Sequence, residues 1–386
     1  MYIREVINPK DVADFHKVPF SVYKNDPSWI PHIKQDIEKI FSPKTNRFFS
    51  HGKAIRWVLY ENNTPIGRVA AFINKKTSNT FKQPTGGLGF FECIKNKNAA
   101  FVLFDTCKSW LKENKMEAMD GPINFGEKNQ FWGLLIENFS SPNTYGMNYN
   151  PLYYKDFFIK YGFKIYYKQY LYSRPINDPL NKKLKTKALR IGRDPNYTFC
   201  SIDKKNIDRY AEDFRLVYNS AWGGHDNFKE MEKKQAIKIL NKLKPIMDED
   251  IIFFGYYKQT PIAFYINIPE LNEIFKYLNG NMNWWGKVKF FYYLKTKRVS
   301  TLYSLVFGVA KRFQGKGVDG AIINYSRKSI KEKGLYKNII MTWIGDFNPK
   351  MLKIIENIGG KKFRTLATYR KIFDKGAHFE RCPIIE

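Results

Sequence analysis

The apolar and polar positions of the first half alternate between strand and helix periodicities. Runs with a period of two, or short continuous apolar runs, predict strands, and apolar residues three or four apart predict helices. The predicted strands cover residues 2–7, 56–60, 66–73, 86–94, 116–119 and 164–172, and the predicted helices cover 9–23, 36–41, 99–113 and 151–161. Strands that alternate with helices in this way predict an α/β fold.

The second half repeats this order from residue 197. Strands are predicted at 197–202, 251–257, 262–268, 304–309, 336–343 and 363–372, and helices at 206–222, 230–243, 321–334 and 349–358. Both predicted hairpins turn at two residues followed by Thr-Pro, at 62–65 and 258–261. The repeat predicts an N-terminal domain at 1–174, a proline- and lysine-containing linker at 175–196, and a C-terminal domain at 197–386.

A glycine-rich turn joins a predicted buried strand to a predicted helix in the segment Val309–Asn324. Glycines let the backbone approach a ligand closely, and the free N–H groups of a helix's first turn favour an anion. Three basic residues flank the turn: Lys311, Arg312 and Lys316. The pattern indicates a diphosphate ligand, with a plain tight connection as the alternative. Gly317 is expected to face solvent when no ligand is bound.

This turn resembles the acyl-CoA pyrophosphate loop of the GNAT N-acyltransferase superfamily, Gln/Arg-x-x-Gly-x-Gly/Ala. The register from Gln314 departs from the pattern only at Asp319, and the register Arg312-x-x-Gly315-x-Gly317 matches every letter. The strand, Asn-capped helix, Gly-Gly and strand that follow resemble the end of a GNAT domain over residues 300–373. The resemblance implies that acyl-CoA contacts Val309, Lys311, Arg312, Gln314, Gly315, Lys316, Gly317, Val318, Asp319, Gly320 and Asn348. The corresponding segment of the first half, 93–98, has no glycine loop.

The whole chain resembles bacterial tandem-GNAT proteins, a group similar to the bacterial ceramide synthases. The resembling segments, in order, are 26–31, 67–68, 89–92, 120–124, 149–154, 218–222, 269–273 and the loop. The resemblance implies a tandem GNAT-like α/β fold with mixed, splayed sheets flanked by helices. It also implies an N-acyltransferase that moves an acyl group from acetyl-CoA or a longer acyl-CoA to an amine acceptor, without a metal.

Three other functions stay open beside that one. The first is a long-chain acyltransferase of the ceramide-synthase type. The second is an acyl-CoA-binding module without turnover, because Ile355 or Glu356 stands where many GNAT enzymes place a tyrosine acid. The third is an aminoacyl transferase, which is similar in its tandem layout.

Transfer of an acyl group to an amine needs a proton acceptor, because an alkyl amine is mostly protonated at neutral pH. The candidates are Glu92, Glu270 and His225. For Glu92 the alternative is an ion pair with Arg68, and for His225 it is an exposed loop position. The thioester oxygen needs a backbone N–H donor, which the resemblance places near Gly308 and Val309.

The composition is strongly basic, with 65 Lys and Arg against 36 Asp and Glu and a formal net charge of +29. Such a charge suits nucleic acid, an anionic membrane or small anions, but no zinc-finger, RNA-binding or zipper motif argues for nucleic acid. No apolar run reaches the roughly 20 residues of a membrane span, and no signal-peptide pattern begins the chain. Four separated cysteines without Cys-x-x-Cys indicate a reduced, cytoplasmic protein.

The segment 283–298 interleaves aromatic residues with lysines. That composition is typical of a helix in the headgroup region of an anionic membrane, so a peripheral place at the inner membrane face is an expectation. The lysines expected to contact lipid are Lys287, Lys289, Lys295 and Lys297. The alternative is a core-packed helix whose lysines reach the surface.

Overall fold

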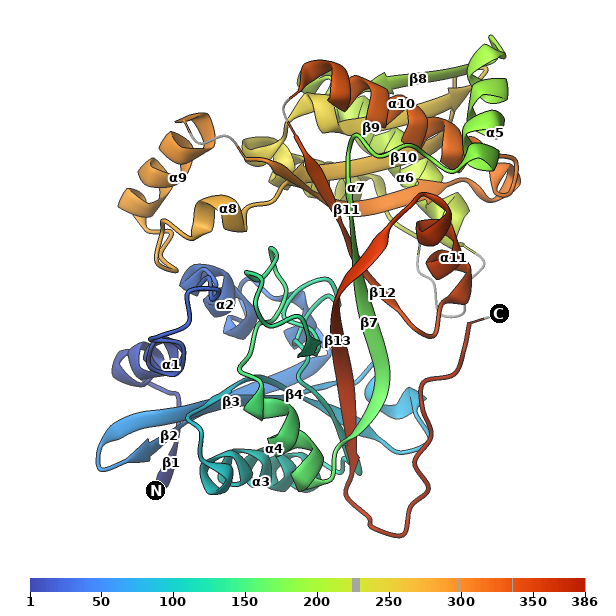
Figure 1. Cartoon of the computed structure of the whole chain (residues 1–386). Helices are drawn as coiled ribbons and strands as arrows, with labels where there is room; N and C mark the ends of the chain where they lie inside the picture. The colour runs from blue at the N-terminus through green and yellow to red at the C-terminus, as the bar shows by residue number, and fades with distance from the viewer. Residues whose placement is uncertain (224–229, 297–298, 335, 386) are drawn as a thin grey trace.

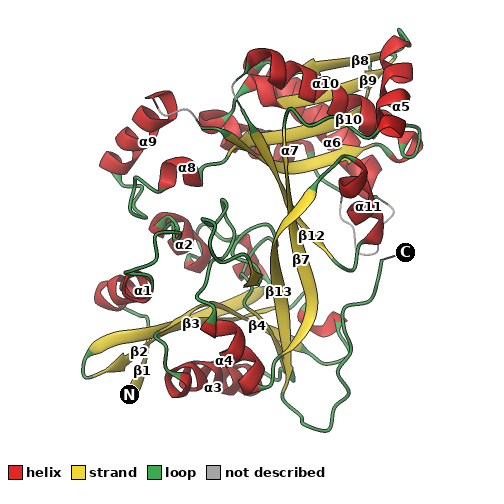
Figure 2. Cartoon of the chain, viewed as in Figure 1, coloured by secondary structure: helices red, strands yellow, loops and turns green. Residues whose placement is uncertain are grey.

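A single twisted sheet runs through the whole molecule (Figure 1). The structure is a computed structural model that describes residues 1–223, 230–296, 299–334 and 336–385. Within these residues 13 strands form the sheet, in the order β1-β2-β3-β4-β5-β13-β7-β12-β11-β10-β9-β8, with β6 paired to β13. Helices cover both faces (Figure 2). The predicted α/β class, with mixed sheets flanked by helices, is confirmed.

The first half of the chain holds seven strands and four helices among the described residues. They are β1 (Tyr2–Glu5), α1 (Pro9–Val22), α2 (Lys34–Phe41), β2 (Gly52–Glu61), β3 (Thr64–Asn74), β4 (Thr85–Cys93), α3 (Lys97–Glu113), β5 (Ala118–Gly121), β6 (Leu134–Glu137), α4 (Tyr153–Tyr161) and β7 (Lys164–Pro175). Helix α3 packs on β3 and β4, and α1 packs on the other face of the same strands (Figure 1).

The second half follows the same plan. Its elements are α5 (Lys182–Arg193), β8 (Tyr197–Ser201), α6 (Ile207–Trp222), α7 (Lys233–Leu243), β9 (Ile252–Tyr257), β10 (Thr260–Pro269), α8 (Asn272–Phe275), α9 (Trp284–Thr296), β11 (Thr301–Val309), α10 (Val318–Lys333), β12 (Asn338–Gly345), α11 (Pro349–Asn357) and β13 (Lys361–Ile372). Helix α10 follows β11 as α3 follows β4, and β11 pairs in parallel with β12 as β4 does with β5.

The two hairpin turns share an unusual backbone. Asn62 and Asn63 have φ of 48° and 59°, and Lys258 and Gln259 have φ of 45° and 66°. Positive φ at both central residues is the signature of a type I′ turn, whose twist matches that of the flanking strands. The two turns that precede Thr-Pro in the sequence therefore also have the same backbone conformation.

The last strand of each half lies among the strands of the other half. Strand β13 is inserted between β5 and β7, and β7 is inserted between β13 and β12. A buried ion pair fastens this exchange, because Arg370 of β13 donates to both Asp120 oxygens at 2.7 and 2.8 Å. Figure 1 shows β7, β12 and β13 joining the upper and lower parts of the molecule.

The segment 175–196, expected as a linker, contains helix α5. Its apolar residues Leu184, Ala188 and Ile191 recur at helical spacing and face α10, against which α5 packs. Because lysines and arginines separate these apolar residues, the sequence analysis did not predict a helix here. The segment is therefore part of the packed structure beside the glycine-rich turn.

Candidate functional site

The start of α10 has no side-chain cap among the described residues. Gly317 precedes the helix with φ of 92°, and no side chain of a described residue caps the first turn. At the corresponding helix of the first half, the side chain of Asn96 accepts hydrogen bonds from the N–H groups of Asn98 and Ala99 at 2.9 and 3.2 Å. The first-turn N–H groups of α3 are thus already bound, whereas those of α10 can receive an anion.

Cations surround the start of α10. Lys311, Arg312 and Lys316 are all exposed. Gly315 between them has φ of 72°, and a Cβ added there would meet nothing within 4 Å. The turn therefore combines positive charge with free space around its backbone, which suits a phosphate group.

Gly317 itself does not face solvent, so that prediction is wrong. It is buried under α5, where an added Cβ would lie 3.2 Å from the Cβ of Lys187 and 3.5 Å from Ile191. At Gly320 the added Cβ would lie 2.7 Å from Leu184. These two glycines let α5 approach α10 closely, and α5 brings the stem of a further cation, Lys187, to the turn.

Strands β11 and β12 separate next to this turn. They pair in parallel only from residues 301–304 to residues 338–341. Beyond that point β12 continues with β7, while β11 keeps β10 alone, with a register irregularity opposite Ile266 and Asn267. The edge of β11 over residues 305–309 is therefore not paired with β12. Of the two predicted oxyanion donors, the Val309 N–H lies on this edge, whereas Gly308, two residues before Ala310, turns its N–H toward β10. Asn348, at the head of α11, accepts a hydrogen bond from the Met351 N–H at 3.1 Å.

Residues near the C-terminal end of helix α6 contact the end of β11. The Ser220 hydroxyl oxygen accepts the N–H of Lys311 at 3.2 Å. The ring of Trp222 packs so close to Gly308 that an added Cβ there would lie 3.0 Å from it. Gln314 bonds back to the Val309 carbonyl oxygen at 3.0 Å. The segment 218–222 therefore contacts the end of β11 and the start of the turn. Its sequence alone did not predict these contacts.

Glu92 lies in a buried network in the first half. Its carboxylate accepts hydrogen bonds from the hydroxyls of Tyr23 and Tyr154 at 2.7 and 2.9 Å, and Arg68 lies 3.7 Å away, so the ion pair considered for this residue is present. Burial raises the pKa of Glu92 to about 7. The cavity beside it measures about 30 Å³, which is room for roughly one water molecule.

Glu270 lies at the junction of the two halves. One carboxylate oxygen accepts the N–H groups of Tyr145 and Asn272 at 2.8 and 3.1 Å. The other oxygen is buried and has no hydrogen-bond partner among the described residues. Burial raises the pKa of Glu270 to about 8.

The structure gathers the predicted loop residues but not the predicted proton acceptors. The Glu270 N–H bonds to Thr301, eight residues before Val309, so Glu270 lies roughly 26 Å from the turn along β11. Glu92 on β4 is five strand spacings from β11, or roughly 24 Å across the sheet. His225 lies outside the described residues.

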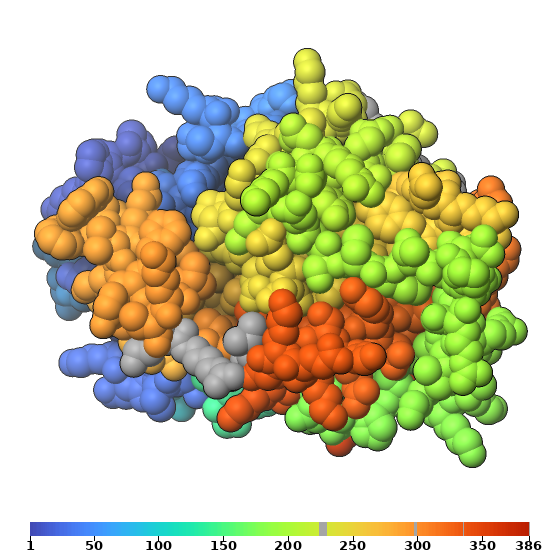
Figure 3. Space-filling view, turned by 90° about the horizontal axis from the view of Figure 1, so that it is seen from above, coloured from blue at the N-terminus to red at the C-terminus, as the bar shows by residue number. Residues whose placement is uncertain are grey.

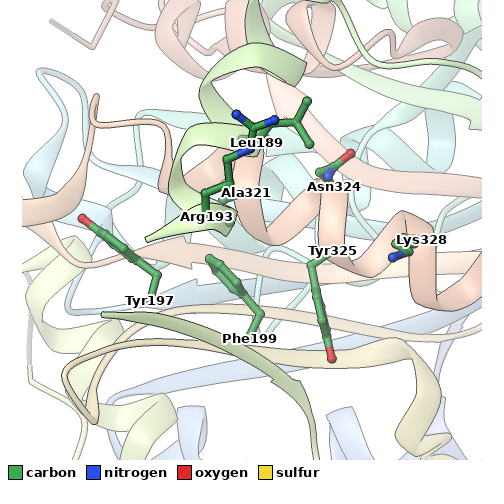
Figure 4. A pocket seen from close by; sticks show the side chains of 10 residues that line it. Leu189, Arg193, Tyr197, Phe199, Ala321, Asn324, Tyr325 and Lys328 are labelled. Atoms are coloured by element: carbon green, nitrogen blue, oxygen red, sulfur yellow. The ribbon is translucent and has the colours of Figure 1, made fainter. Parts of the chain in front are cut away.

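A groove of about 330 Å³ runs beside the turn, between α5, β8 and α10 (Figure 4). The rings of Tyr197, Phe199 and Tyr325 form its wall, and Arg193 and Lys328 add positive charge. None of the described residues that line it carries a carboxylate, imidazole or thiol. The groove is therefore suited to binding rather than to acid–base chemistry. Among the described residues, no group of three or more His, Cys, Asp or Glu side chains is placed to hold a metal ion.

Two bacterial proteins match this chain over nearly its whole length. Bacterial ceramide synthase of Caulobacter vibrioides is 24% identical over 375 residues, which cover 95% of this chain and 96% of that protein. Protein YghO of Escherichia coli is 24% identical over 376 residues, which cover 96% and 95%. No protein-family model matches.

Solved structures share the architecture at low sequence identity. The tandem GNAT protein from the clavulanic acid biosynthesis pathway aligns over 97% of this chain and 100% of its own, with a TM-score of 0.55 and 8% identity. The GCN5-related glucosamine N-acetyltransferase region of a fungal multi-domain β-N-acetylglucosaminidase aligns with a TM-score of 0.54 and 12% identity, over 96% of this chain and 38% of the fungal chain. Together with the repeated strand order and the splayed strands, these likenesses show that the chain has the tandem GNAT fold.

Proposed function

We propose that the protein is an acyl-CoA-dependent N-acyltransferase whose acyl-CoA site lies in its C-terminal half. The observation that carries the proposal is the uncapped start of α10, set among cations and directly beside the open edge of β11. An anion position that continues into an unpaired strand edge is the arrangement that a diphosphate followed by an amide-containing arm requires. The 24% identity to a protein named bacterial ceramide synthase supports an acyltransferase.

The residues of the turn fit an acyl-CoA. The N–H groups at the head of α10 with Lys311, Arg312 and Lys316 would receive the diphosphate. The two amides of the pantetheine arm would pair with the open edge of β11, with Asn348 beyond the point where β11 and β12 separate. The aromatic groove between α5 and α10 would take the adenine ring, because base–aromatic stacking needs only a flat apolar face.

In the proposed reaction, an amine attacks the thioester carbon of acyl-CoA directly. The amine nitrogen forms the new C–N bond and loses a proton, and the C–S bond breaks to release CoA thiol. A backbone N–H of β11 near Gly308 and Val309 would stabilise the oxyanion. Neither described candidate is within hydrogen-bond reach of these donors, because Glu270 bonds to Thr301, roughly 23 Å before Gly308 along β11, and Glu92 is roughly 24 Å away across the sheet. We therefore assign the proton acceptor to neither of them.

Two narrower readings are favoured by particular observations. A long-chain acyl donor and a lipid amine are favoured by the name of the Caulobacter relative. A module that binds acyl-CoA without turnover is favoured by Ile355 and Glu356, which stand where many GNAT enzymes carry a tyrosine acid.

The test compares two triple variants that remove the same charge. Lys311→Gln/Arg312→Gln/Lys316→Gln alters the turn, and Lys233→Gln/Lys234→Gln/Lys238→Gln alters exposed positions of α7. In calorimetric titration with CoA, we expect the turn variant to lose more than tenfold in affinity, about 1.4 kcal/mol, and the α7 variant to change little. Equal affinity in all three proteins would show that the turn is only a connection.

Turnover is then measured as thiol release from acyl-CoA in the presence of amines. Acetyl-CoA and a long-chain acyl-CoA are offered separately, each with a short alkyl amine and with a long-chain amino alcohol. Thiol release that requires an amine supports the transferase. CoA binding without thiol release under any of these conditions would exclude the transferase and support a module that only binds acyl-CoA. Activity with acetyl-CoA alone would exclude a long-chain acyltransferase of the ceramide-synthase type.

A further inference from the structure

Helix α9 is apolar on both of its faces, but only one face is buried. Phe290 and the small Gly286 are buried, and Tyr293 and Leu294 are half-buried beside them. This inner face packs on Phe275 and other residues of a core that also includes Ile30 and Ile33 of the first half. The inner face therefore already has its partner within the chain.

The outer face of α9 carries large apolar side chains in solvent. Trp284 and Trp285 are 67% and 65% exposed, and Val288, Phe291 and Tyr292 are 45%, 45% and 60% exposed. At about 100° per residue these five positions share an arc of about 120°. Five large apolar residues on one arc form a continuous stripe, which soluble monomers rarely leave uncovered.

Lysines border this stripe. Lys287 and Lys289 lie on its two sides and Lys295 lies near its C-terminal end, and all three are exposed. The helix holds no acidic residue. Aromatic residues flanked by lysines suit the headgroup layer of an anionic bilayer, where rings enter the boundary and ammonium groups meet phosphates.

The stripe is held in a fixed direction. The connection into α9 is anchored to the first half by backbone and side-chain bonds, in which Gly280 accepts the N–H of Lys34 at 2.8 Å and Gln35 accepts the N–H of Met282 at 2.9 Å. Figure 3 shows α9, in orange, as a projecting lobe at the edge of the molecule. A projecting, anchored helix can reach a flat surface without a rearrangement of the fold.

We propose that α9 is an interfacial helix that binds the protein to anionic lipid bilayers. The bilayer fits better than a second copy of this chain, because a chain with a net charge of +29 repels its own copy and is attracted to acidic phospholipid. No helix among the described residues is long and apolar enough to span a membrane. An interfacial helix lies in the plane of the headgroup layer. The binding does not depend on whether the chain transfers acyl groups.

The experiment measures flotation with vesicles of phosphatidylcholine alone and of phosphatidylcholine mixed with phosphatidylglycerol. Two variants address the stripe, Trp284→Ser/Trp285→Ser and Lys287→Gln/Lys289→Gln/Lys295→Gln. Two matched controls change equal numbers of exposed residues elsewhere, Leu152→Ser/Ile159→Ser and Lys233→Gln/Lys234→Gln/Lys238→Gln. Tryptophan emission and thermal melts are recorded for every protein.

The full chain should bind the anionic vesicles and shift its tryptophan emission to the blue. The α9 lysine variant should lose binding on the order of a hundredfold, about fivefold for each lysine, and the tryptophan variant should lose both binding and the shift. Both controls should keep most of the binding. Failure of the folded chain to bind anionic vesicles, or equal loss in the α7 lysine control, would overturn the proposal. So would a dimer in light scattering that the tryptophan variant abolishes.

Discussion

Gly89 of β4 lies where the chain cannot accommodate a side chain. A Cβ added there would lie 1.9 Å from the carbonyl oxygen of Ile123, which is backbone and cannot rotate away. We expect Gly89→Ala to reduce the free energy of unfolding by about 3 kcal/mol or more, because the strand must move. Urea unfolding followed by circular dichroism measures the loss.

Gly192 near the end of α5 is the matched control. An added Cβ would meet nothing within 4 Å there, and the residue is helical. Gly192→Ala should therefore raise stability slightly, by about 0.5 kcal/mol, since alanine loses less backbone entropy in a helix. Equal effects of the two substitutions would contradict the packing described around β4.

Glu270 should make the protein less stable as the pH rises. Its pKa is raised from 4.5 to about 8, so the folded state keeps a proton that the unfolded state releases within this window. The contribution of this group to stability is therefore greatest below pH 4.5 and is lost as the pH rises through 8, by an amount on the order of 5 kcal/mol. Glu270→Gln, which is always neutral, should lessen the decline in unfolding midpoint between pH 5 and pH 8.5.

The control for this prediction is Glu113→Gln, which neutralises an exposed carboxylate at the end of α3. Its pH profile should match that of the unaltered chain. Part of the decline should remain in the Glu270→Gln variant, because Glu92 has a pKa of about 7 and acts with the same sign. A profile unchanged by Glu270→Gln would show that this carboxylate is hydrated in solution.

Single residues were predictable where the signal is local. The Asn348 cap and the glycine turn follow from neighbours within a few positions, and both are present. Only one of the three partners of Glu92 was predictable, because Arg68 lies on the adjacent strand, whereas Tyr23 follows the end of α1 and Tyr154 lies in α4. The burial of Gly317 was not predictable, since it depends on a helix that the sequence presented as a linker.

At the scale of elements, helices and strands with a strong hydrophobic periodicity were predicted from the sequence, and those with a weak periodicity were not. The hairpins, the strands before and after the glycine turn, and helices α6 and α10 were predicted with small shifts at their ends. Helix α5 was missed because eight of its twelve residues are polar or glycine and Leu189 is exposed, which leaves a buried stripe of only three residues. Strand β6 was missed because four residues carry too little periodicity, and its order comes from pairing with β13.

At the scale of the whole molecule, the sequence predicted that the two halves repeat the same order of elements. It did not predict that each half places its last strand among the strands of the other half. Nothing in the residues of β7 or β13 distinguishes a strand that closes its own half from one that enters the other half. The exchange depends on pairing between residues about 200 positions apart. We keep the division into 1–174 and 197–386 as a proposal about repeats rather than about independent folding.

The exchanged strands predict that the halves unfold together. Fragments 1–196 and 197–386 should each be largely unfolded alone, because β13 fills the place between β5 and β7, and β7 the place between β13 and β12. Mixed or coexpressed, they should regain the circular dichroism spectrum of the intact chain. The intact chain should show one calorimetric transition. Two separate transitions, or a cooperatively folded single fragment, would contradict this prediction.

The inserted strand also sets an order for biosynthesis. When β7 leaves the ribosome, the edges of β5 and β7 that β13 will join are unpaired, and almost 200 residues remain to be made before β13 appears. At about 5–20 residues per second this lasts roughly 10–40 s, during which a nascent chain carries open strand edges. The sheet of the first half is thus completed only when β13 has been made, and until then the segments of β5 and β7 can pair with another chain.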